Sequence, residues 1–344
     1  MKIVVLAGGT STEREVSIVT GTGVCKALRQ KGRRAILVDV FCGVESVDTE
    51  DLFPEKYDVE AASAYITGFN SQIEEMKAAR RDFFGPHVIE LCKEADIVFL
   101  GLHGANGEDG RVQAAFDLMG IRYTGTGYLS SAMAMDKGIA KWMFQMHGVP
   151  VPGGVTMTRK EERKKPAEFG LGFPLVVKTC CGGSSIGVYI VSSQEEYEQA
   201  LDAAFSYEDE VVVEEFVKGT EYTVAVVDGE AYPVVQIIPL EGFYDYKNKY
   251  KPGAVQENCP APISEELTRR LQKYAVRGYH ALELESYARL DFIVTEDEKI
   301  YCLEANTLPG MTPTSLIPQE AAVLGMDYPS LCEELIRVSM KRYE

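Results

Sequence analysis

Four polar side chains near the end of the sequence have the types and spacing to hold a metal ion beside phosphate. Arg289 and Asp291 lie in one predicted strand, and Glu304 and Asn306 end the next. Residues i and i+2 of a strand point to the same face, so each pair shares a face. Two carboxylates and a carboxamide are hard oxygen ligands that suit Mg²⁺. The alternative, a solvated polar face, fits poorly with the apolar residues around Arg289 and Asp291.

A glycine-rich loop, CGGSSIG at 181–187, follows Lys178 at the end of another predicted strand. Backbone N–H groups without side chains can approach phosphate oxygens, and a lysine adds a point charge. A hairpin loop can also be glycine-rich without binding anything, so this loop alone leaves both interpretations open. Neither G-x-G-x-x-G nor G-x-x-x-x-G-K-[ST] occurs, which disfavours a Rossmann dehydrogenase and a P-loop ATPase.

Three further segments could belong to a site. Residues 242–253 are aromatic, basic and bounded by turns, which suits a mobile lid over an anion or an exposed loop. Residues 306–312 offer backbone N–H groups at a turn that could stabilise an oxyanion. His103 follows a buried strand at the edge where open α/β sheets bind ligands, although a hydrogen-bonded core histidine is the commoner case.

The composition describes an ordinary globular protein with an acidic surface. The 344 residues are 46% hydrophobic and 25% charged, and the formal net charge is −17. This charge argues against a non-specific binder of nucleic acid or anionic membranes, and no apolar run approaches the roughly 18 residues of a bilayer span. The eight cysteines form no C-x-x-C pair and no Cys/His cluster, so we expect free thiols and a cytoplasmic protein.

The length predicts two or three domains, and the periodicities indicate three α/β domains. The chain starts as strand, loop, helix, strand, the signature of a parallel layer. Strands are predicted at 3–7, 35–40, 96–102, 175–178, 188–191, 211–214, 222–227, 234–238, 288–294 and 300–304. Helices are predicted around 18–28, at 71–81, 136–147, 194–205 and 265–282, and in the C-terminal tail.

Five motifs, taken together, resemble those of the D-alanine–D-alanine ligases, which are ATP-grasp enzymes. They are GGTSTEREVS at 8–17, LHGANGEDG at 102–110, YTG at 123–125, MDK at 135–137 and LEANT at 303–307. The match runs in order from residue 3 to about 330. Residues 42–95 carry no motif of this kind.

The resemblance implies a three-domain ATP-grasp architecture with a parallel-sheet N-terminal domain. The implied boundaries are 1–123, 124–213 and 214–344, with a lid at 242–256. ATP would lie between the second and third domains. The implied activity is ATP-dependent ligation of two D-alanine molecules through an acyl phosphate, which supplies peptidoglycan precursors for the cell wall. A homodimer is expected as well.

The resemblance also assigns roles residue by residue. Lys137 and Lys178 would contact phosphates, and the contacts to base and ribose fall on Glu214, Phe216, Val217, Glu221 and Phe243. Two Mg²⁺ ions, with Mn²⁺ as a substitute, would be held by Asp291, Glu304 and Asn306. The first D-alanine and the oxyanion would be met by Glu13, His103, Arg289 and Gly310. The second carboxylate would be bound by Lys249 and Ser315, and a network across the domains would join Glu13, Ser184 and Tyr250.

Two alternatives remain at this stage. A sister ligase would make D-alanyl-D-lactate or D-alanyl-D-serine, but Tyr250 disfavours lactate and the apolar Leu316 leaves a serine hydroxyl without a partner. A nucleotide-binding regulator without catalysis would show gaps among the predicted metal and oxyanion residues, and there are none. Two residues depart from commoner family patterns. Gly182 bears on the rigidity of the glycine-rich loop, and Glu215 bears on the contacts at the edge of adenine.

Overall fold

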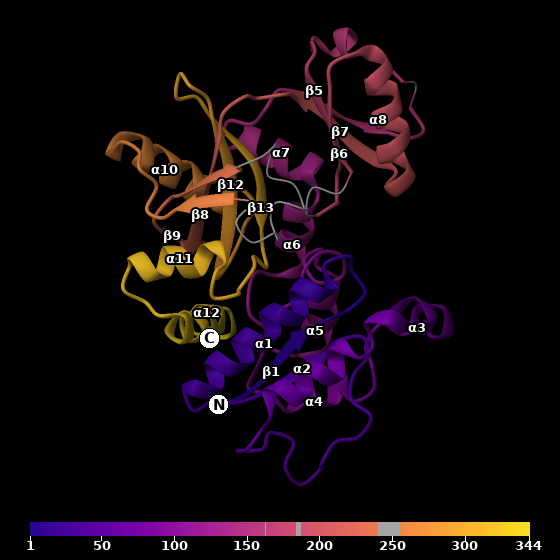
Figure 1. The fold of residues 1–344 in the computed structure, drawn as a ribbon, viewed down its shortest axis with the longest axis vertical. Coiled ribbons are helices and arrows are strands. Elements are labelled where there is room, and N and C mark those ends of the chain that lie inside the picture. The colour runs from indigo at the N-terminus through magenta and orange to yellow at the C-terminus, as the bar shows by residue number, and fades with distance from the viewer. Residues whose placement is uncertain (162, 184–186, 240–254) are drawn as a thin grey trace.

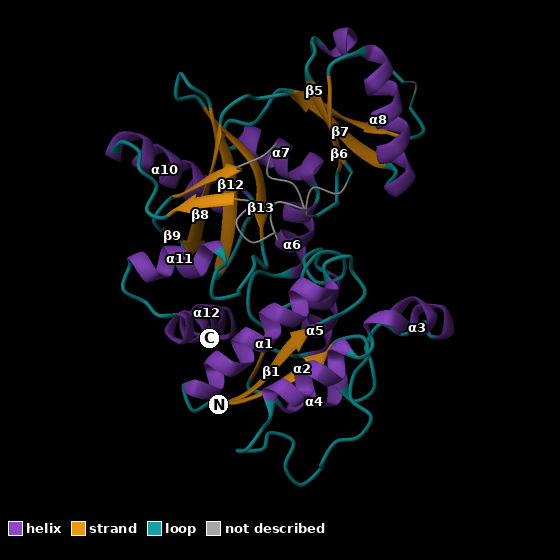
Figure 2. Cartoon of the chain, in the orientation of Figure 1, coloured by secondary structure: helices purple, strands orange, loops and turns teal. Residues whose placement is uncertain are grey.

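The structure is a computed structural model that describes residues 1–344 except 162, 184–186 and 240–254. Figure 1 gives the labels of the elements, and Figure 2 separates helices from strands. The described strands form three sheets. Within the described part of the chain, no helix combines the length and apolarity needed to cross a membrane.

The N-terminal sheet is parallel, which confirms the expected architecture of this domain. Its order is β2-β1-β3, with β1 at Lys2–Ala7, β2 at Arg34–Asp39 and β3 at Ile97–Leu100. All of β3, and β1 and β2 after their first residues, are buried, as expected for strands that are covered on both faces.

Helices surround this sheet, and one prediction about them is wrong. The described elements are α1 (Arg14–Gln30), α2 (Val59–Thr67), η1 (Asn70–Gln72), α3 (Ile73–Ala79), α4 (Val88–Glu94) and α5 (Arg111–Met119). The single helix predicted at 71–81 is a 3₁₀ turn followed by the shorter α3, and the sequence does not predict α2, α4 or α5. The short helices bury few residues, so their apolar period is weak in the sequence.

The central sheet is antiparallel and carries the glycine-rich loop between two of its strands. Its order is β4-β7-β5-β6, with β4 at Gly154–Thr158, β5 at Leu175–Thr179, β6 at Val188–Val191 and β7 at Glu210–Glu215. The helix α8 (Gln194–Tyr207) packs against it, and the 3₁₀ turn η2 (Pro166–Phe169) precedes β5. Ser193 caps α8 by accepting a hydrogen bond from the backbone N–H of Glu196.

The third sheet has the order β11-β10-β8-β12-β13, with β9 paired to β8. Its strands are β8 (Thr220–Val227), β9 (Glu230–Ala231), β10 (Val235–Pro239), β11 (Val255–Asn258), β12 (Tyr287–Val294) and β13 (Ile300–Asn306). The helices of this half of the chain are α10 (Glu265–Ala281), α11 (Leu316–Val323), α12 (Tyr328–Met340) and the 3₁₀ turn η3 (Lys341–Tyr343).

The hydrophobic cores join segments that are distant in the sequence. α6 (Tyr128–Met135) and α7 (Lys137–Met146) share a core with β8, β12 and α10. α12 packs against α1, so the end of the chain returns to the N-terminal layer (Figure 1). The boundaries given above therefore stay predictions, since α6 and α7 share the core of the third sheet.

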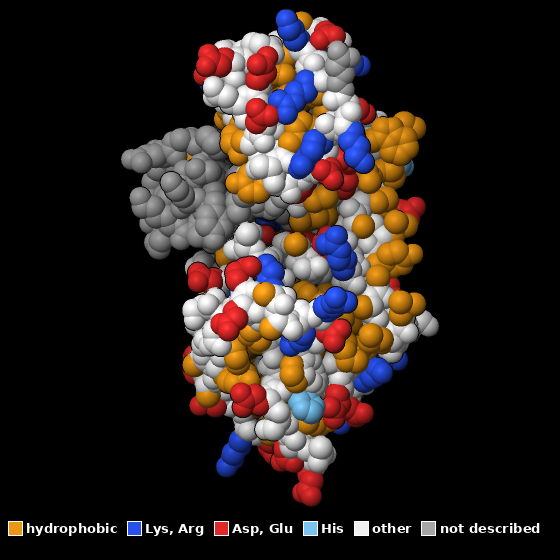
Figure 3. Space-filling view, turned by 90° about the vertical axis from the view of Figure 1, so that its right-hand side faces the viewer, with side chains coloured by type: hydrophobic (Ala, Val, Ile, Leu, Met, Phe, Trp, Pro, Cys, Tyr) orange, Lys and Arg blue, Asp and Glu red, His pale blue; other side chains and the backbone are white. Residues whose placement is uncertain are grey.

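A surface on α5, α6 and α7 leaves large hydrophobic side chains exposed. Figure 3 shows hydrophobic side chains gathered along one edge of the molecule in that view. On these helices the exposed members are Leu118, Met119, Tyr128, Leu129, Ile139, Trp142 and Met146. α6 packs against both α5 and α7, so we treat these seven residues as one surface, called the α5–α7 surface below.

Candidate active site

The four polar residues predicted as metal and oxyanion groups meet on neighbouring strands. β12 and β13 pair antiparallel, with Arg289 opposite Asn306 and Asp291 opposite Glu304. The Arg289 guanidinium donates to both oxygens of Asp291, over 2.9 Å from Nε and 2.8 Å from Nη2. The Asn306 carboxamide donates to Asp291 Oδ2 over 2.9 Å, and the Thr223 hydroxyl donates to Oδ1 over 2.6 Å. The sequence prediction that Arg289 and Asp291 share a face is confirmed.

Lys137 connects this cluster to the glycine-rich loop. It is the first residue of α7, and its Nζ lies 3.4 Å from Glu304 Oε2 and donates to the carbonyl of Gly182 over 2.6 Å. Burial alone would lower the pKa of Lys137, but the carboxylate of Glu304 outweighs it and raises the pKa. Lys137 is therefore a cation whose position is fixed by Glu304, a predicted metal ligand, and by the glycine-rich loop that is predicted to bind phosphate.

A second charged cluster lies between α7 and the central sheet. Lys178 Nζ lies 2.5 Å from Glu214 Oε1, and Lys141 Nζ binds the other oxygen, Oε2. All three side chains are at least nine-tenths buried. Burial would raise the pKa of Glu214, but Lys178 and Lys141 together hold it below its ordinary value. The sequence analysis missed Lys141, although its spacing of four residues from Lys137 places both on one face of a helix.

The N-terminal loop brings Glu13 against two glycines from other parts of the chain. Glu13 is buried, and a Cβ added at either Gly104 or Gly183 would lie 2.8 Å from its Oε2. Gly104 also has φ +68°, a conformation that L side chains rarely adopt. The structure thus places the glycine-rich loop of the central sheet beside Glu13, and a larger residue at either glycine would displace the carboxylate.

His103 is buried and hydrogen-bonded through both ring nitrogens. Nε2 lies 2.9 Å from the Thr20 hydroxyl, and Nδ1 lies 3.0 Å from the carbonyl of Leu308. Burial lowers the pKa of His103, so the ring is neutral near pH 7. These contacts tie the loop after β3 to the loop after β13.

Glu108 joins the same two loops, and the sequence analysis did not single it out. Its oxygens accept from the backbone N–H of Gly104 over 2.8 Å and of Leu308 over 3.2 Å. Burial, and then the charge of Glu13, raise the pKa of Glu108 to about 8. The only signal in the sequence is its place in LHGANGEDG, where an acidic residue between two glycines also suits a solvated turn.

The residues expected around the acceptor lie together at the start of α11. A Cβ added at Gly310 would lie 3.1 Å from the Ser315 hydroxyl oxygen, which accepts from the backbone N–H of Thr312 over 3.0 Å. Leu316 is buried in a small apolar cluster with Val235 and Ile237. The loop 306–310 therefore runs from the predicted metal residues to the predicted acceptor pocket.

The remaining predicted nucleotide contacts follow β7 or lie on β8. Phe216 and Val217 follow β7, with Phe216 36% exposed and Val217 partly exposed, and Glu221 is a partly exposed residue of β8. Four predicted site residues lie outside the described residues: Ser184, Phe243, Lys249 and Tyr250. The predicted lid at 242–256 falls there too, except for Val255 and Gln256, which begin β11.

The oxygen donors at β12 and β13 fit a cation that is shared with phosphate. The described residues contain no cluster of three or more His, Cys, Asp or Glu side chains that could hold a metal by themselves. Asp291, Glu304 and Asn306 instead offer two carboxylates and a carboxamide. Mg²⁺ is usually bound by one or two carboxylates together with substrate phosphates and water, so this donor set suits it.

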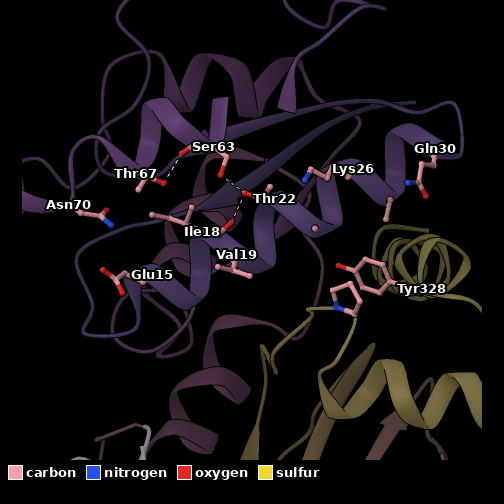
Figure 4. A pocket seen from close by; sticks show the side chains of 13 residues that line it. Glu15, Ile18, Val19, Thr22, Lys26, Gln30, Ser63, Thr67, Asn70 and Tyr328 are labelled. Carbon is pink, nitrogen blue, oxygen red and sulfur yellow. Dashed lines mark hydrogen bonds between the residues drawn. The ribbon is translucent and has the colours of Figure 1, made fainter. Parts of the chain in front are cut away.

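A separate cavity of about 560 Å³ lies on the other side of α1. Figure 4 shows it between α1, the segment from Ser63 to Asn70, and the ring of Tyr328 on α12. Glu15 and Lys26 lie on its rim, and the hydroxyl of Thr22 donates to Ser63 Oγ over 2.9 Å. No residue predicted for the active site lines this cavity.

Comparison with known proteins matches the whole chain to one family. Residues 2–126 match the model of the D-ala D-ala ligase N-terminus, and residues 143–337 match that of the D-ala D-ala ligase C-terminus. A D-alanine–D-alanine ligase of Lacticaseibacillus casei (strain BL23) is 40% identical over 353 residues, covering 100% of this chain and 97% of the relative.

Solved structures of this kind superpose over almost the full length. The D-alanine–D-alanine ligase of Bacillus anthracis, complexed with ATP, has 30% identity and a TM-score of 0.75, covering 99% of this chain and 98% of that one. The VanG D-Ala:D-Ser ligase of Enterococcus faecalis has 29% identity and a TM-score of 0.78, covering 98% and 99%.

Proposed function

The chain belongs to the D-alanine–D-alanine ligase family, and from this premise we propose how its residues carry out the reaction. The enzyme has the ATP-grasp fold and joins two D-alanine molecules to D-alanyl-D-alanine at the expense of ATP, a step that supplies cell wall synthesis. The observation that carries the assignment of residues is the cluster on β12 and β13, which faces Lys137 at the start of α7.

In the first step, a carboxylate oxygen of D-alanine attacks the γ-phosphorus of ATP, and the bond to ADP breaks. The product is D-alanyl phosphate. Phosphoryl transfer needs positioning and charge neutralisation more than covalent help. We assign these tasks to Lys137, which donates to the carbonyl of Gly182 in the glycine-rich loop, and to Lys178, which lies on β5 just before that loop and is paired with Glu214.

In the second step, the amino nitrogen of the other D-alanine attacks the acyl carbon. The nitrogen loses a proton, phosphate leaves, and the tetrahedral intermediate passes through an oxyanion. We assign stabilisation of this oxyanion to the Arg289 guanidinium and the backbone N–H of Gly310. Arg289 lies opposite Asn306 in the sheet, and Gly310 lies in the loop that follows Asn306. The Arg289 side chain is fixed by its two hydrogen bonds to Asp291.

We assign Glu13 to the ammonium group of the first D-alanine. Its buried carboxylate lies close to both Gly104 and Gly183, and a carboxylate is the group that suits an ammonium ion. His103 keeps the nearby loops together through Thr20 and Leu308. Ser184 and Tyr250 would extend this network, as the resemblance implies.

We propose that Asp291, Glu304 and Asn306 hold two Mg²⁺ ions, for which Mn²⁺ can substitute. When bound, a divalent cation neutralises the charge of the phosphates. The residues themselves are pre-positioned, because Thr223, Arg289 and Asn306 all donate to Asp291.

We propose D-alanine as the second substrate, in preference to D-serine. Leu316 lies in an apolar cluster with Val235 and Ile237 and offers no hydrogen-bond partner to a hydroxyl. A buried hydroxyl without a partner costs about 1–3 kcal/mol. The likeness to the D-Ala:D-Ser ligase keeps D-serine as the second candidate acceptor.

We further propose that the enzyme is a homodimer that buries the α5–α7 surface. Ile139, Trp142 and Met146 recur at intervals of three and four residues along α7, and Trp142 is 60% exposed. A helix stripe of this kind normally faces a partner. Sedimentation should give a dimer of the 38.0 kDa chain and a monomer for Trp142→Glu. Tyr207→Glu, at an equally exposed aromatic residue of α8, should remain dimeric, and a dimeric Trp142→Glu would refute the assignment.

We place the enzyme in the cytoplasm. All eight cysteines are free thiols, which suits a reducing compartment.

The test of the assignment is a product assay. The protein is incubated with ATP, Mg²⁺ and D-alanine, D-serine or D-lactate, and phosphate release is followed together with chromatography of the products. We expect D-alanyl-D-alanine as the main product and little mixed product. No phosphate release with D-alanine would refute the proposed function, and preferential formation of D-alanyl-D-serine would refute the role of Leu316.

A further inference from the structure

Glu214, the residue expected to meet adenine, is shared by two lysines, and only one of them has an expected role. Lys178 is expected at the phosphates, whereas Lys141 belongs to no motif discussed above. The Nζ atom of Lys178 lies 2.5 Å from Oε1 of Glu214, and the Nζ atom of Lys141 contacts Oε2. All three side chains are buried, so two lysines share one carboxylate; burial lowers the pKa of Lys141, and the charge of Glu214 opposes this shift.

This sharing matters because buried ions are stable only when they are paired. If Lys178 turns to an anionic phosphate, it leaves Glu214 Oε1 without its present partner. Lys141 then remains as the cation that keeps the carboxylate ionised. A carboxylate left alone in this environment would take up a proton and would become a hydrogen-bond donor.

We propose that Lys141 is a positioning residue for base recognition. It stays on Glu214 Oε2 and leaves Oε1 as an acceptor for the exocyclic amino group of adenine, while Lys178 exchanges Glu214 for a phosphate. This inference rests on the proposed function, since it takes the nucleotide site as given.

The position of α7 supports separate roles for its lysines at the base and at the phosphates. Lys137 and Lys141 are separated by one turn and point to the same side of the helix. Lys137 reaches Glu304 and the carbonyl of Gly182, on the phosphate side, and Lys141 reaches Glu214, on the base side. α7 packs between the third sheet and β7, so one rigid element positions both ends of the nucleotide site (Figure 1).

The test compares ATP with inosine triphosphate, which carries an oxo group in place of the amino group. Lys141→Met retains much of the length of the side chain and removes the charge, and Glu214 still has Lys178 in the free enzyme. We expect KM for ATP to rise roughly 10- to 100-fold, the range for a lost charged hydrogen bond, with KM for D-alanine unchanged. Because a protonated Glu214 can donate to the oxo group, the preference for ATP over inosine triphosphate should shrink by a similar factor.

Two variants control for a merely structural effect. Lys141→Arg keeps the charge and should restore most of the preference for ATP. Lys31→Met removes another partly buried lysine, which donates to Ser330 on α12, and should leave both nucleotides unaffected. If Lys141→Met is too unstable to assay, Lys141→Gln removes the same charge and keeps a polar side chain, and stabilisation of this variant and of the wild type against heat by each nucleotide gives the same comparison without turnover.

The outcomes separate this inference from the proposed function. A wild-type enzyme that forms no D-alanyl-D-alanine refutes the proposed function. An active wild type together with a Lys141→Met variant that loses ATP and inosine triphosphate equally, or neither, refutes only the role of Lys141. A Lys141→Arg variant that behaves like Lys141→Met would also overturn it, because the retained charge would then have no effect.

Discussion

The two charged clusters on either side of α7 differ in how far water reaches them. The side chains of Arg289, Asp291 and Glu304 retain 13%, 18% and 27% of their exposure, whereas those of Lys178 and Glu214 retain 8% and 4%. Water still reaches the carboxylates of the first cluster, which are paired with Arg289 and Lys137, so a ligand can approach them from solvent. A sealed carboxylate must be paired inside the protein, so a ligand there has to replace a partner.

Because the two clusters differ in their exposure to water, mutations in them should have different effects on activity and stability. In the partly exposed cluster of Arg289, Asp291 and Glu304, loss of a side chain should affect the reaction more than the fold. In the sealed cluster, the same loss should affect both binding and stability, because neighbouring charges depend on it.

The largest effect is expected for Glu304→Ala. Loss of one charge-stabilising group in the transition state commonly costs about 3–4 kcal/mol, or roughly 10²–10³ in turnover. The free energy of unfolding should fall by less than it does for a residue of the sealed cluster, since Glu304 is partly exposed and Lys137 keeps its hydrogen bond to the carbonyl of Gly182. Turnover and denaturant unfolding measured together decide this. Glu298→Ala, at the β12–β13 turn, is the matched control, and near-normal turnover of a folded Glu304→Ala would dismiss the metal role.

The next effect concerns the sealed cluster. Lys178→Ala should raise KM for ATP roughly 10- to 100-fold and leave KM for D-alanine nearly constant, because it removes a charged contact to the nucleotide. It should also lower the free energy of unfolding by about 1–3 kcal/mol, since Glu214 loses one of its two partners. Equal small changes in both Michaelis constants would indicate an ordinary buried ion pair, and an unchanged stability would contradict the distinction between the clusters.

Glu108 extends the comparison to a buried carboxyl that has no cation among its hydrogen-bond partners. Its pKa is raised to about 8, so the folded protein holds a proton that the unfolded chain releases at a lower pH. The stability gained from the neutral form is complete below the ordinary pKa of 4.5 and is lost as the pH rises through about 8. Between pH 7 and pH 9 the wild type should lose roughly 1 kcal/mol of unfolding free energy.

The Glu108→Gln variant has no carboxyl group at this position and therefore no proton to release in this pH range. Its unfolding free energy should be lower than that of the wild type at pH 7, because an amide cannot accept from both Gly104 and Leu308. The decline from pH 7 to pH 9 should become smaller by about the same 1 kcal/mol. Identical pH profiles of the two proteins in denaturant titrations would show that Glu108 does not titrate in this range.

The smallest effect is expected at Tyr250, which lies outside the described residues. Tyr250→Phe removes the hydroxyl and, with it, the hydrogen bond that the family resemblance implies, worth about 0.5–1.5 kcal/mol or roughly 2- to 13-fold. The variant should lose some dipeptide synthesis and gain D-alanyl-D-lactate near neutral pH. Chromatography with both acceptors present gives the ratio of the two products. An unchanged ratio would mean that the hydroxyl does not select the acceptor.

Several elements were predictable from the sequence. The predicted strands 188–191 and 288–294 and the helix 265–282 agree with the structure to within one residue at each end. The short helices α2, α4, α5 and α6 are not predicted, because a helix of about two turns offers too few apolar positions to show a period.

The sequence by itself determined the chemistry of the exposed cluster. Arg289 and Asp291 are two residues apart in one strand, and the alternation of a strand is enough to place them on one face. The family followed from five motifs in fixed order, each of which is a local property of the chain.

Only the tertiary structure decided which ionisable side chains meet partners that are distant in the sequence. Glu108 meets Leu308 across 200 residues, and Lys141 meets Glu214 across 73. No local pattern encodes these contacts, because they depend on how the three sheets pack around α7 and the loop after β13. Burial then determines which of these groups remain charged, and burial is a property of the packed chain.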